Sequence, residues 1–350
     1  MTMGMTGSSK VYPPGRPLQL RRNARVLATA AAVPDQVVTN DDLIRELDLI
    51  ASDRAVQHSI GIRERRRAAE NVPTSKYLCE AAQKCIDRAG ISAEQLDRVI
   101  YCRLFGDHAI PTTSMRVLEG LHIGRGVPAI DISAACSGFM HATELALSAI
   151  NAGDDYVLIL AGDRVAPVRN ALAAKDTTTV FLNGDGVAAM LLGHSDEPRF
   201  RASYFYTDSD LWDWASIPFG TETMSADRGI DPKLFALKMP DGPRIHRSVI
   251  ESCKIVTERL LTLANLSLKN IDFFITSDQT HFVWRDQLKL LGLTEDQSVS
   301  CFAKYGNTVA AMAPLNLNEA IETGRLERGM TVLMMAHGAG ASGGGFIFTY

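Results

Sequence analysis

The feature that most constrains the fold is a repeated alternation of short apolar runs with segments of helical length. Runs of this length, rich in Val, Ile and Phe, are typical of buried strands. They read RVIYCRLF (98–105), VPAIDIS (127–133), DYVLILAGD (155–163), GVAAMLLG (186–193), IDFFITS (271–277), TVLMMAH (331–337) and GGGFIFTY (343–350). Helices are expected between them, for example over 74–90, where Gly90 suits a C-cap. The pattern predicts an α/β protein.

The two halves of the chain repeat one pattern. In each half a strand leads through a turn of small residues into a helix and then into a second buried strand. The first turn surrounds Cys136, and its helix ends near Gly153; in the second half, residues 305–324 lead into the strand at 331–337. We expect duplicated halves whose two helix N-termini lie near a common centre. The alternative is that any two strand–helix–strand units look alike.

On this pattern we divide the chain into three parts. Residues 1–22 are rich in Gly, Ser, Pro and charge and are expected to form a flexible leader. Residues 23–195 are the half that carries Cys136, and residues 196–350 are the half with the Gly-rich loops.

Composition excludes several classes of protein. With 350 residues, 46% of them hydrophobic and 22% charged, the chain is long enough to bury an extensive core. The net charge of -4 argues against a nucleic-acid partner. The six cysteines are scattered, without CxxC pairs or zinc-type spacing, so neither a disulfide framework nor a metal is expected. Because no apolar run reaches the length of a membrane span and no signal peptide precedes the fold, we expect a cytoplasmic protein.

Cys136 stands in SAACSGF, where the strand at 127–133 is expected to end and a helix to begin. Amide dipoles at a helix N-terminus favour a thiolate, and small neighbours let a substrate carbonyl approach the sulfur. The N–H of Cys136 can also help to hold an oxyanion. A buried structural cysteine is the alternative. The residues alone leave both readings open.

Several motifs, taken in order, resemble the chain-initiating β-ketoacyl-acyl-carrier-protein synthases, the third ketosynthase class of the thiolase superfamily. SAACSGF is similar to the family's nucleophile turn. The other matching stretches are GIRERR (61–66), HAIPT (108–112), NGDGVAAMLLG (183–193), KYGNTVAA (304–311) and EAIETGRLERGMTVLMMAHGAG (319–340). The resemblance runs from about residue 25 to residue 350. It implies a five-layered αβαβα fold, a homodimer, and an acyltransferase with Cys136 as nucleophile and no permanently bound cofactor.

The resemblance also implies a catalytic Asn and a catalytic His in the second half. The Asn is similar to Asn307 of YGNT, but an ungapped count places Ser277 where the family has its His. A serine hydroxyl is not a useful base near pH 7 and cannot carry positive charge beside an enolate. This departure argues against decarboxylative condensation by the family's usual route.

Other side chains offer replacements for the missing imidazole. His281 follows four residues later, and a slip of one residue would place Asp278 at the His position and His281 at the Asn position. His337 stands in the Gly-rich loop, at a position that is often Phe in the family, and is either functional or a packed His. By resemblance, the N–H of Ala339 in that loop is the second oxyanion donor beside that of Cys136.

The donor entrance departs from the family as well. Relatives that load from coenzyme A hold its adenine between a Trp and an Arg, and the matching positions are Ala55 and Ser59. Two phosphate-binding arginines correspond to Thr177 and Phe282. We therefore expect an acyl donor on the phosphopantetheine of an acyl carrier protein or other carrier protein. The basic run RERRRA (63–68) is either a contact for that acidic partner or a solvated face.

Three functions remain open. In the first, Cys136 takes an acyl group from a carrier protein and passes it to an O, N or C nucleophile of a small molecule, with Asn307 and Ser277 positioning the acceptor. In the second, a relocated His such as His337 supports decarboxylative condensation with malonyl carrier protein. In the third, the chain is a non-catalytic partner subunit. The expected setting is polyketide or other natural-product biosynthesis, with fatty acid biosynthesis as the broader class of chemistry. The sequence does not identify the acyl group or the acceptor.

Overall fold

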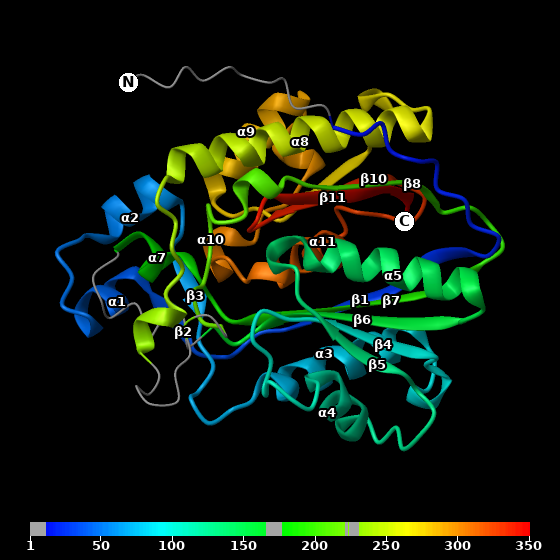
Figure 1. The fold of residues 1–350 in the computed structure, drawn as a ribbon, viewed down its shortest axis with the longest axis horizontal. Coiled ribbons are helices and arrows are strands. Elements are labelled where there is room, and N and C mark those ends of the chain that lie inside the picture. The colour runs from blue at the N-terminus through cyan, green and yellow to red at the C-terminus, as the bar shows by residue number, and fades with distance from the viewer. Residues whose placement is uncertain (1–11, 166–176, 221–222, 224–230) are drawn as a thin grey trace.

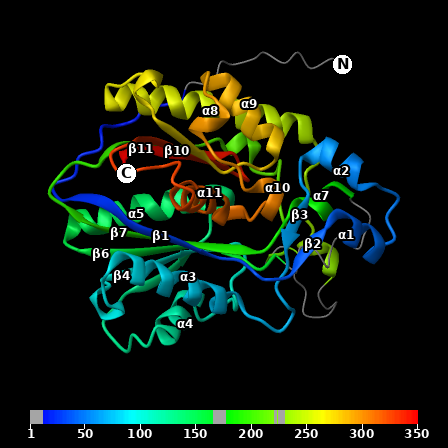
Figure 2. The ribbon, with the colours of Figure 1, turned by 180° about the vertical axis from the view of Figure 1, so that it is seen from behind.

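The computed structural model describes residues 12–165, 177–220, 223 and 231–350. Helices and strands stack in alternating layers: two outer layers of helices, two sheets inside them, and a central helical layer between the sheets (Figure 1). The same layers are visible from behind (Figure 2). The five-layered αβαβα fold predicted from the sequence is thereby confirmed.

The first sheet has five strands in the order β1-β7-β6-β4-β5. β5 pairs only with β4, so it is an edge strand. The strands are β1 (Asn23–Ala32), β4 (Arg98–Cys102), β5 (Ala129–Ile132), β6 (Tyr156–Asp163) and β7 (Gly186–Ser195). Helices α3 (Thr74–Ala89) and α4 (Thr113–Gly120) cover its outer face (Figure 1). α3 ends at Gly90, whose φ of 69° is left-handed, as the C-cap prediction requires.

The second sheet has four strands in the order β8-β11-β10-β9. They are β8 (Phe200–Thr207), β9 (Phe273–Thr276), β10 (Thr331–Gly338) and β11 (Ser342–Thr349). Helices α8 (Gly242–Ala264) and α9 (His281–Leu291) cover its outer face (Figure 1). All seven strands predicted from apolar runs are present in the two sheets.

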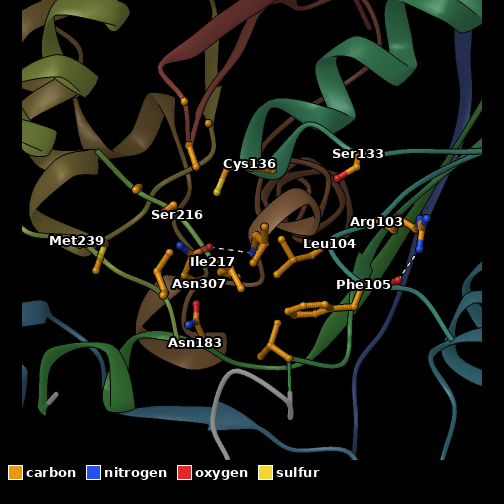
Figure 3. A pocket seen from close by; sticks show the side chains of 18 of the residues that line it. Arg103, Leu104, Phe105, Ser133, Cys136, Asn183, Ser216, Ile217, Met239 and Asn307 are labelled. Carbon is orange, nitrogen blue, oxygen red and sulfur yellow. Dashed lines mark hydrogen bonds between the residues drawn. The ribbon is translucent and has the colours of Figure 1, made fainter. Parts of the chain in front are cut away.

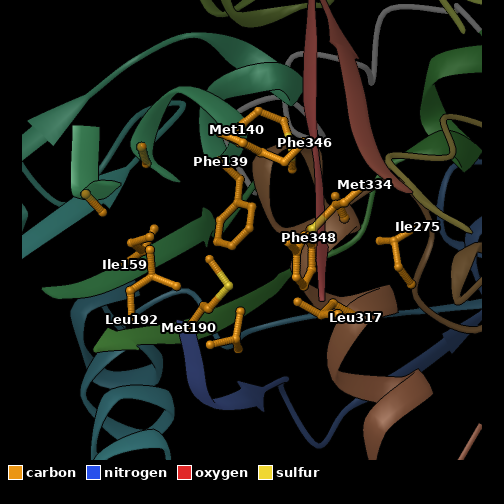
Figure 4. Close-up of a cluster of buried hydrophobic side chains, with 14 of the residues drawn as sticks. Phe139, Met140, Ile159, Met190, Leu192, Ile275, Leu317, Met334, Phe346 and Phe348 are labelled. Carbon is orange, nitrogen blue, oxygen red and sulfur yellow. The ribbon is translucent and has the colours of Figure 1, made fainter. Parts of the chain in front are cut away.

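The central layer holds α5 (Gly138–Ala152) and α11 (Met312–Glu322), which lie between the two sheets (Figure 1). The core cluster there joins Phe139 of α5, Met190 of β7, Leu317 of α11 and Phe346 of β11 (Figure 4). Fully burying a side chain of this size stabilises the fold by about 1.5–3 kcal/mol. Both sheets therefore depend on the same core, which holds the starts of the two central helices in place.

A cap at one end of the layers contains short elements (Figure 1). They are α1 (Asn40–Glu46), α2 (Asp53–Ile60), α7 (Thr177–Leu182), α10 (Phe302–Tyr305), β2 (Val37–Thr39) and β3 (Glu64–Arg66). Arg65 of β3 is 1% exposed and donates to Asn40 Oδ1 and to the carbonyl of Phe181, both at 2.8 Å. Within the run RERRRA, Arg65 therefore holds this cap together, whereas Arg63 is exposed.

Residues 12–22 of the expected leader contact both halves. Arg259 donates to the carbonyl of Tyr12 at 3.1 Å, and the Tyr204 hydroxyl donates to the carbonyl of Pro13 at 2.9 Å. The backbone N–H of Arg21 donates to Asn151 of α5 at 2.7 Å, and a flexible leader stays a prediction. The two sheets fall within 23–195 and 196–350, which we propose as the two halves of the fold. No helix of the described residues has the length and apolar character needed to span a membrane.

Candidate active site

The nucleophile turn joins the first sheet to the central helical layer. β5 ends at Ile132, a single 3₁₀ turn covers Ala135–Ser137, and α5 begins at Gly138, so Cys136 lies at the helix N-terminus as predicted. Ala135 has a φ of 46°, a left-handed conformation that costs a non-glycine residue free energy and recurs at functional sites. Gly138 lets the turn approach β4, since a Cβ there would lie 2.0 Å from Cys102 Sγ.

Cys136 opens onto a cavity of about 680 Å³ (Figure 3). Its side chain is half-buried, and it is one of several polar residues that line the cavity. Much of the remaining wall is apolar, with Phe105, Ile217 and Met239 among its side chains. The cavity can therefore hold an acyl chain against apolar surface while its carbonyl lies near the sulfur.

Asn307 reaches Cys136 from the loop between α10 and α11. Its side chain lowers the pKa of the Cys136 thiol and so favours the thiolate, and its Oδ1 accepts the N–H of Val309 at 2.8 Å. Val309 has a φ of 58°, which is strained for a β-branched residue. The two loops predicted to carry the nucleophile and the Asn thus meet at the cavity, and each contains a left-handed residue.

Burial raises the pKa of the Cys136 thiol to about 11. Hydrogen bonds from its own backbone N–H and from the Asn307 side chain oppose this rise by stabilising the thiolate. At pH 7 the resting nucleophile is therefore mainly a thiol, and acylation requires removal of its proton.

The Gly-rich loop between β10 and β11 lies against the nucleophile turn. A Cβ on Gly338 would lie 2.7 Å from Ser137 Oγ and 2.9 Å from its backbone nitrogen, so only glycine permits this approach. Ala339 follows and lines the cavity. The predicted pair of oxyanion donors, the N–H groups of Cys136 and Ala339, is thus carried by two loops in contact.

His337 lines the cavity and is 6% exposed. Its Nδ1 has no hydrogen-bond partner among the described residues, and burial lowers the pKa of the imidazole to about 4. The ring is therefore neutral at pH 7. Its backbone carbonyl accepts a hydrogen bond of 2.9 Å from the Gln279 side chain, which also lines the cavity.

Ser277 and Asp278 lie behind the cavity wall. Ser277 follows β9, is 1% exposed and is not among the residues that line the cavity, so the expectation that its hydroxyl positions the acceptor is not met. Asp278 is fully buried, accepts hydrogen bonds from Ser300 and Asn316, and has its pKa raised to about 7 by burial. Asp278 therefore does not reach the cavity, because its carboxyl is held inside the second half.

The remaining predicted positions lie outside the cavity wall. His281 is the first residue of α9 and packs against Trp284, with ring centroids 5.4 Å apart. Phe282 is 38% exposed, and Ala55 and Ser59 are exposed on α2. Thr177 begins α7, but its side chain is outside the described residues.

Two polar residues that the sequence did not single out also line the cavity, Asn183 and Gln279. The stretch NGDG, which contains Asn183, is interpretable from sequence only as a structural turn. Gln279 lies two residues after Ser277, just beyond a predicted strand, and this position was the only sequence feature that could have indicated a place in the site. Within the described residues, no group of three or more His, Cys, Asp or Glu side chains is arranged to hold a metal ion.

Duplicated layers around a cysteine at a helix start define a thiolase-fold acyl-transferring enzyme, and comparisons with known proteins agree. Residues 130–210 match the family model 3-oxoacyl-[acyl-carrier-protein] synthase III, and residues 261–350 match the model of its C-terminal part. The β-ketoacyl-[acyl-carrier-protein] synthase III 1 of Vibrio vulnificus is 31% identical over 322 residues, covering 92% of this chain and 98% of that protein.

Solved structures extend the agreement to three dimensions. The synthase III of Aquifex aeolicus superimposes with a TM-score of 0.83 at 28% identity, over 94% of this chain and all of that one. The priming β-ketosynthase of the R1128 polyketide pathway gives a TM-score of 0.85 at 26% identity, over 96% and 98%. The chain belongs to the β-ketoacyl-acyl-carrier-protein synthase III family and is an acyltransferase of the ketosynthase III type.

Proposed function

We propose that Cys136 accepts an acyl group from the phosphopantetheine arm of a carrier protein and passes it to an O, N or C nucleophile of a small molecule. The observation that carries this proposal is that Cys136 and Asn307 line the same cavity, where the Asn307 side chain favours the thiolate, combined with the buried Ser277 at the expected His position. The nucleophile remains, whereas the group expected to assist decarboxylation does not.

The transfer takes two steps. The Cys136 sulfur attacks the thioester carbonyl and forms a new C–S bond, after which the C–S bond to phosphopantetheine breaks. The departing phosphopantetheine thiolate takes up the proton that the Cys136 thiol gives up, so the step is balanced. The acceptor then attacks the acyl-enzyme and releases the sulfur. In both steps the N–H groups of Cys136 and Ala339 hold the oxyanion, and Asn307 stays beside the sulfur. Asn307 and Gln279, which line the cavity, replace Ser277 as the groups available to position the acceptor.

The donor is a carrier protein rather than free coenzyme A. The α2 positions expected to stack on an adenine carry Ala55 and Ser59, both exposed and neither aromatic. Losing a stack and its charged neighbours weakens nucleotide binding by about 1–3 kcal/mol for each contact. The relatives' names refer to an acyl carrier protein as the carrier of the β-ketoacyl product, which supports a carrier protein as a partner. The polyketide priming relative supports a role in polyketide or other natural-product biosynthesis.

Intact-mass spectrometry tests the acyl-enzyme. The protein is incubated with a panel of acyl carrier proteins and, separately, with the matching acyl-coenzyme A compounds. The expected result is an acyl adduct formed faster from carrier proteins, located on Cys136 by peptide mapping and absent in Cys136→Ser. No adduct from any donor would overturn the proposal. Equal rates from both donors would overturn its donor assignment.

A second candidate is decarboxylative condensation assisted by His337. This imidazole lines the cavity and, with its pKa lowered to about 4, is neutral at pH 7, so it can donate a hydrogen bond to a developing enolate. Incubation with acyl and malonyl carrier proteins separates the two candidates. Release of carbon dioxide with a β-ketoacyl product, lost in His337→Phe, supports condensation. Acylation without carbon dioxide release supports the first proposal.

We propose further that the protein forms a homodimer through the free edge of β5. Ile130 on this strand is 41% exposed, and Met115 on the adjoining α4 is 55% exposed. Unpaired edge strands with exposed apolar residues are unfavourable in a monomer. Light scattering is expected to give twice the chain mass, falling to one chain in Ile130→Lys. A monomeric parent protein would contradict the assignment.

A further inference from the structure

Asn183 and Asn307 lie side by side in the cavity although they are distant in sequence. Their backbones form an isolated parallel bridge, in which Asn307 N–H donates to the carbonyl of Leu182 at 2.8 Å. Both side chains line the cavity, and Asn307 lies between Cys136 and Asn183 in the view of Figure 3. One strand spacing, about 5 Å, separates neighbours in such a bridge. Asn183 is thus positioned to meet the first few carbons of an acyl group held on Cys136.

The Asn183 amide has no hydrogen bond to any described residue, although the residue is only 4% exposed. Other buried amides are paired: Asn307 accepts the N–H of Val309, and Asn316 binds Thr276, Asp278 and Cys301. An amide offers one acceptor and two donors, and buried polar groups are normally satisfied. The Asn183 amide is therefore free to bond a polar group that enters the cavity.

The surroundings of Asn183 define the chemistry of that partner. Phe105, Leu182 and Ile217 contribute apolar surface to the same cavity, so a purely hydrocarbon acyl chain would leave the amide without a partner. Arg103 is the only Lys or Arg among the described residues of the cavity wall, and it donates to the Phe105 carbonyl at 2.5 Å and lies 3.6 Å from Asp131. The described wall thus offers no free cation for a carboxylate, which favours a neutral oxygen.

We propose, on the basis of the function proposed above, that Asn183 is a specificity-determining residue which selects acyl groups bearing a hydroxyl or keto oxygen close to the thioester. The amide donates to a keto oxygen, or both donates to and accepts from a hydroxyl. A site that hydrogen bonds a substrate oxygen also discriminates against the analogue without it, because the buried amide then loses its partner.

Matched thioesters test the proposal. Hexanoyl, 3-hydroxyhexanoyl and 3-oxohexanoyl groups are presented on pantetheine, with the butyryl series in parallel, and the rate of adduct formation on Cys136 is measured by intact mass. The oxygenated members are expected to acylate the wild-type enzyme about 10- to 100-fold faster at equal chain length. In Asn183→Leu this preference for oxygenated groups should disappear or reverse. In the control Ile217→Val, the acylation rates of both members of each pair should change by the same factor.

A binding measurement keeps this inference separate from the acyl-transfer proposal. Pantetheine amides carrying the same acyl groups cannot acylate the protein, so their affinities for Cys136→Ala and Cys136→Ala/Asn183→Leu are measured by calorimetry. Tighter binding of the oxygenated amides, lost with Asn183, supports the inference even if no thioester forms an adduct. Equal affinities within each pair, or a preference retained in both Asn183→Leu and Asn183→Ala, would overturn it. Thermal melting of each variant verifies that it is folded.

Discussion

The hydroxyl oxygens of Ser137 and Ser342 lie 2.6 Å apart and join the nucleophile turn of the first half to the start of β11 in the second. Ser137 also donates to the carbonyl of Ala134 at 2.9 Å. Because a hydroxyl has a single proton, Ser342 must donate to Ser137 in the remaining bond. The position of Cys136 is thus coupled to the loop that carries Ala339, and this coupling does not depend on the bound substrate.

We expect Ser342→Ala to lower both stability and activity. The substitution leaves the buried Ser137 oxygen without its donor, which should lower the free energy of unfolding by about 1–2 kcal/mol. Urea denaturation measures this loss, and acylation of Cys136 should slow as the turn becomes less fixed. Ser148→Ala is the matched control, since that hydroxyl donates to Glu144 on the exposed face of α5. Equal unfolding curves for both variants would show that the hydrogen bond between Ser137 and Ser342 does not contribute to the free energy of unfolding.

Gly338→Ala should impair chemistry more than folding. Gly338 does not have a positive φ, so alanine fits its backbone, but the new Cβ would meet the Ser137 backbone nitrogen at 2.9 Å. One of the two loops must shift, which separates the N–H groups of Cys136 and Ala339. Losing one oxyanion donor costs about 100- to 1000-fold in kcat. Steady-state kinetics measures the loss.

The control for this substitution is Gly124→Ala. A Cβ at Gly124 meets nothing within 4 Å, and its φ is not positive. We expect wild-type kinetics from this variant. Activity of Gly338→Ala within about twofold of the wild type would mean that the Gly-rich loop contributes no oxyanion donor.

The raised pKa of the Cys136 thiol predicts a steep pH profile for its alkylation. With a pKa of about 11, the thiolate fraction and the iodoacetamide rate should rise about tenfold per pH unit from pH 7 to about pH 10. Asn307→Leu removes a hydrogen bond that lowers this pKa, so alkylation at a given pH should be slower. Peptide mass mapping follows Cys136 separately from the other cysteines. A plateau below pH 8.5 would contradict this prediction and would indicate that a further group stabilises the thiolate.

Sequence patterns predicted the strands well where apolar β-branched residues form a continuous run, as in β6 and β10. β1 was not predicted, because ATAAA at its end is poor in strand-forming residues and forms a strand only through pairing with β7. β8 overlaps the start of the aromatic-rich segment 204–220, and its pairing partner β11 is distant in sequence. Edge strands of this kind depend on tertiary contacts that one sequence does not show.

The candidate site, like the strands, combines features that the local sequence predicts with features that depend on tertiary contacts. The turn at Cys136 follows from a local change from strand to helix, which a sequence displays. The burial of Ser277 behind the wall and the exposure of Gln279 to the cavity depend on how the segment after β9 packs beside β10. Asn183 faces the cavity because its backbone pairs with Asn307. Such relations between distant segments become visible only in three dimensions.

Asp278 should make stability depend on pH in a direction opposite to that of an ordinary carboxylate. Burial raises its pKa from 3.8 to about 7 in the folded protein, against an unfolded value near 4. Between these values the folded chain binds a proton that the unfolded chain has lost, so this group's contribution to the free energy of unfolding falls as pH rises from about 4 to about 7. The loss is on the order of 3 kcal/mol across this window.

Asp278→Asn removes this titration while keeping a group that can bond Ser300 and Asn316. The difference in unfolding free energy between wild type and variant, measured in urea at several pH values, should shift in favour of the variant as pH rises from 4 to 7 and then level off. Ser300→Ala provides a second measurement: its hydrogen bond lowers the pKa of Asp278, so removing it should extend the slope to higher pH. If the difference in unfolding free energy between wild type and Asp278→Asn stays constant from pH 4 to 7, Asp278 is already ionised in the folded protein at pH 4. A cation or a water molecule would then have to stabilise the buried carboxylate.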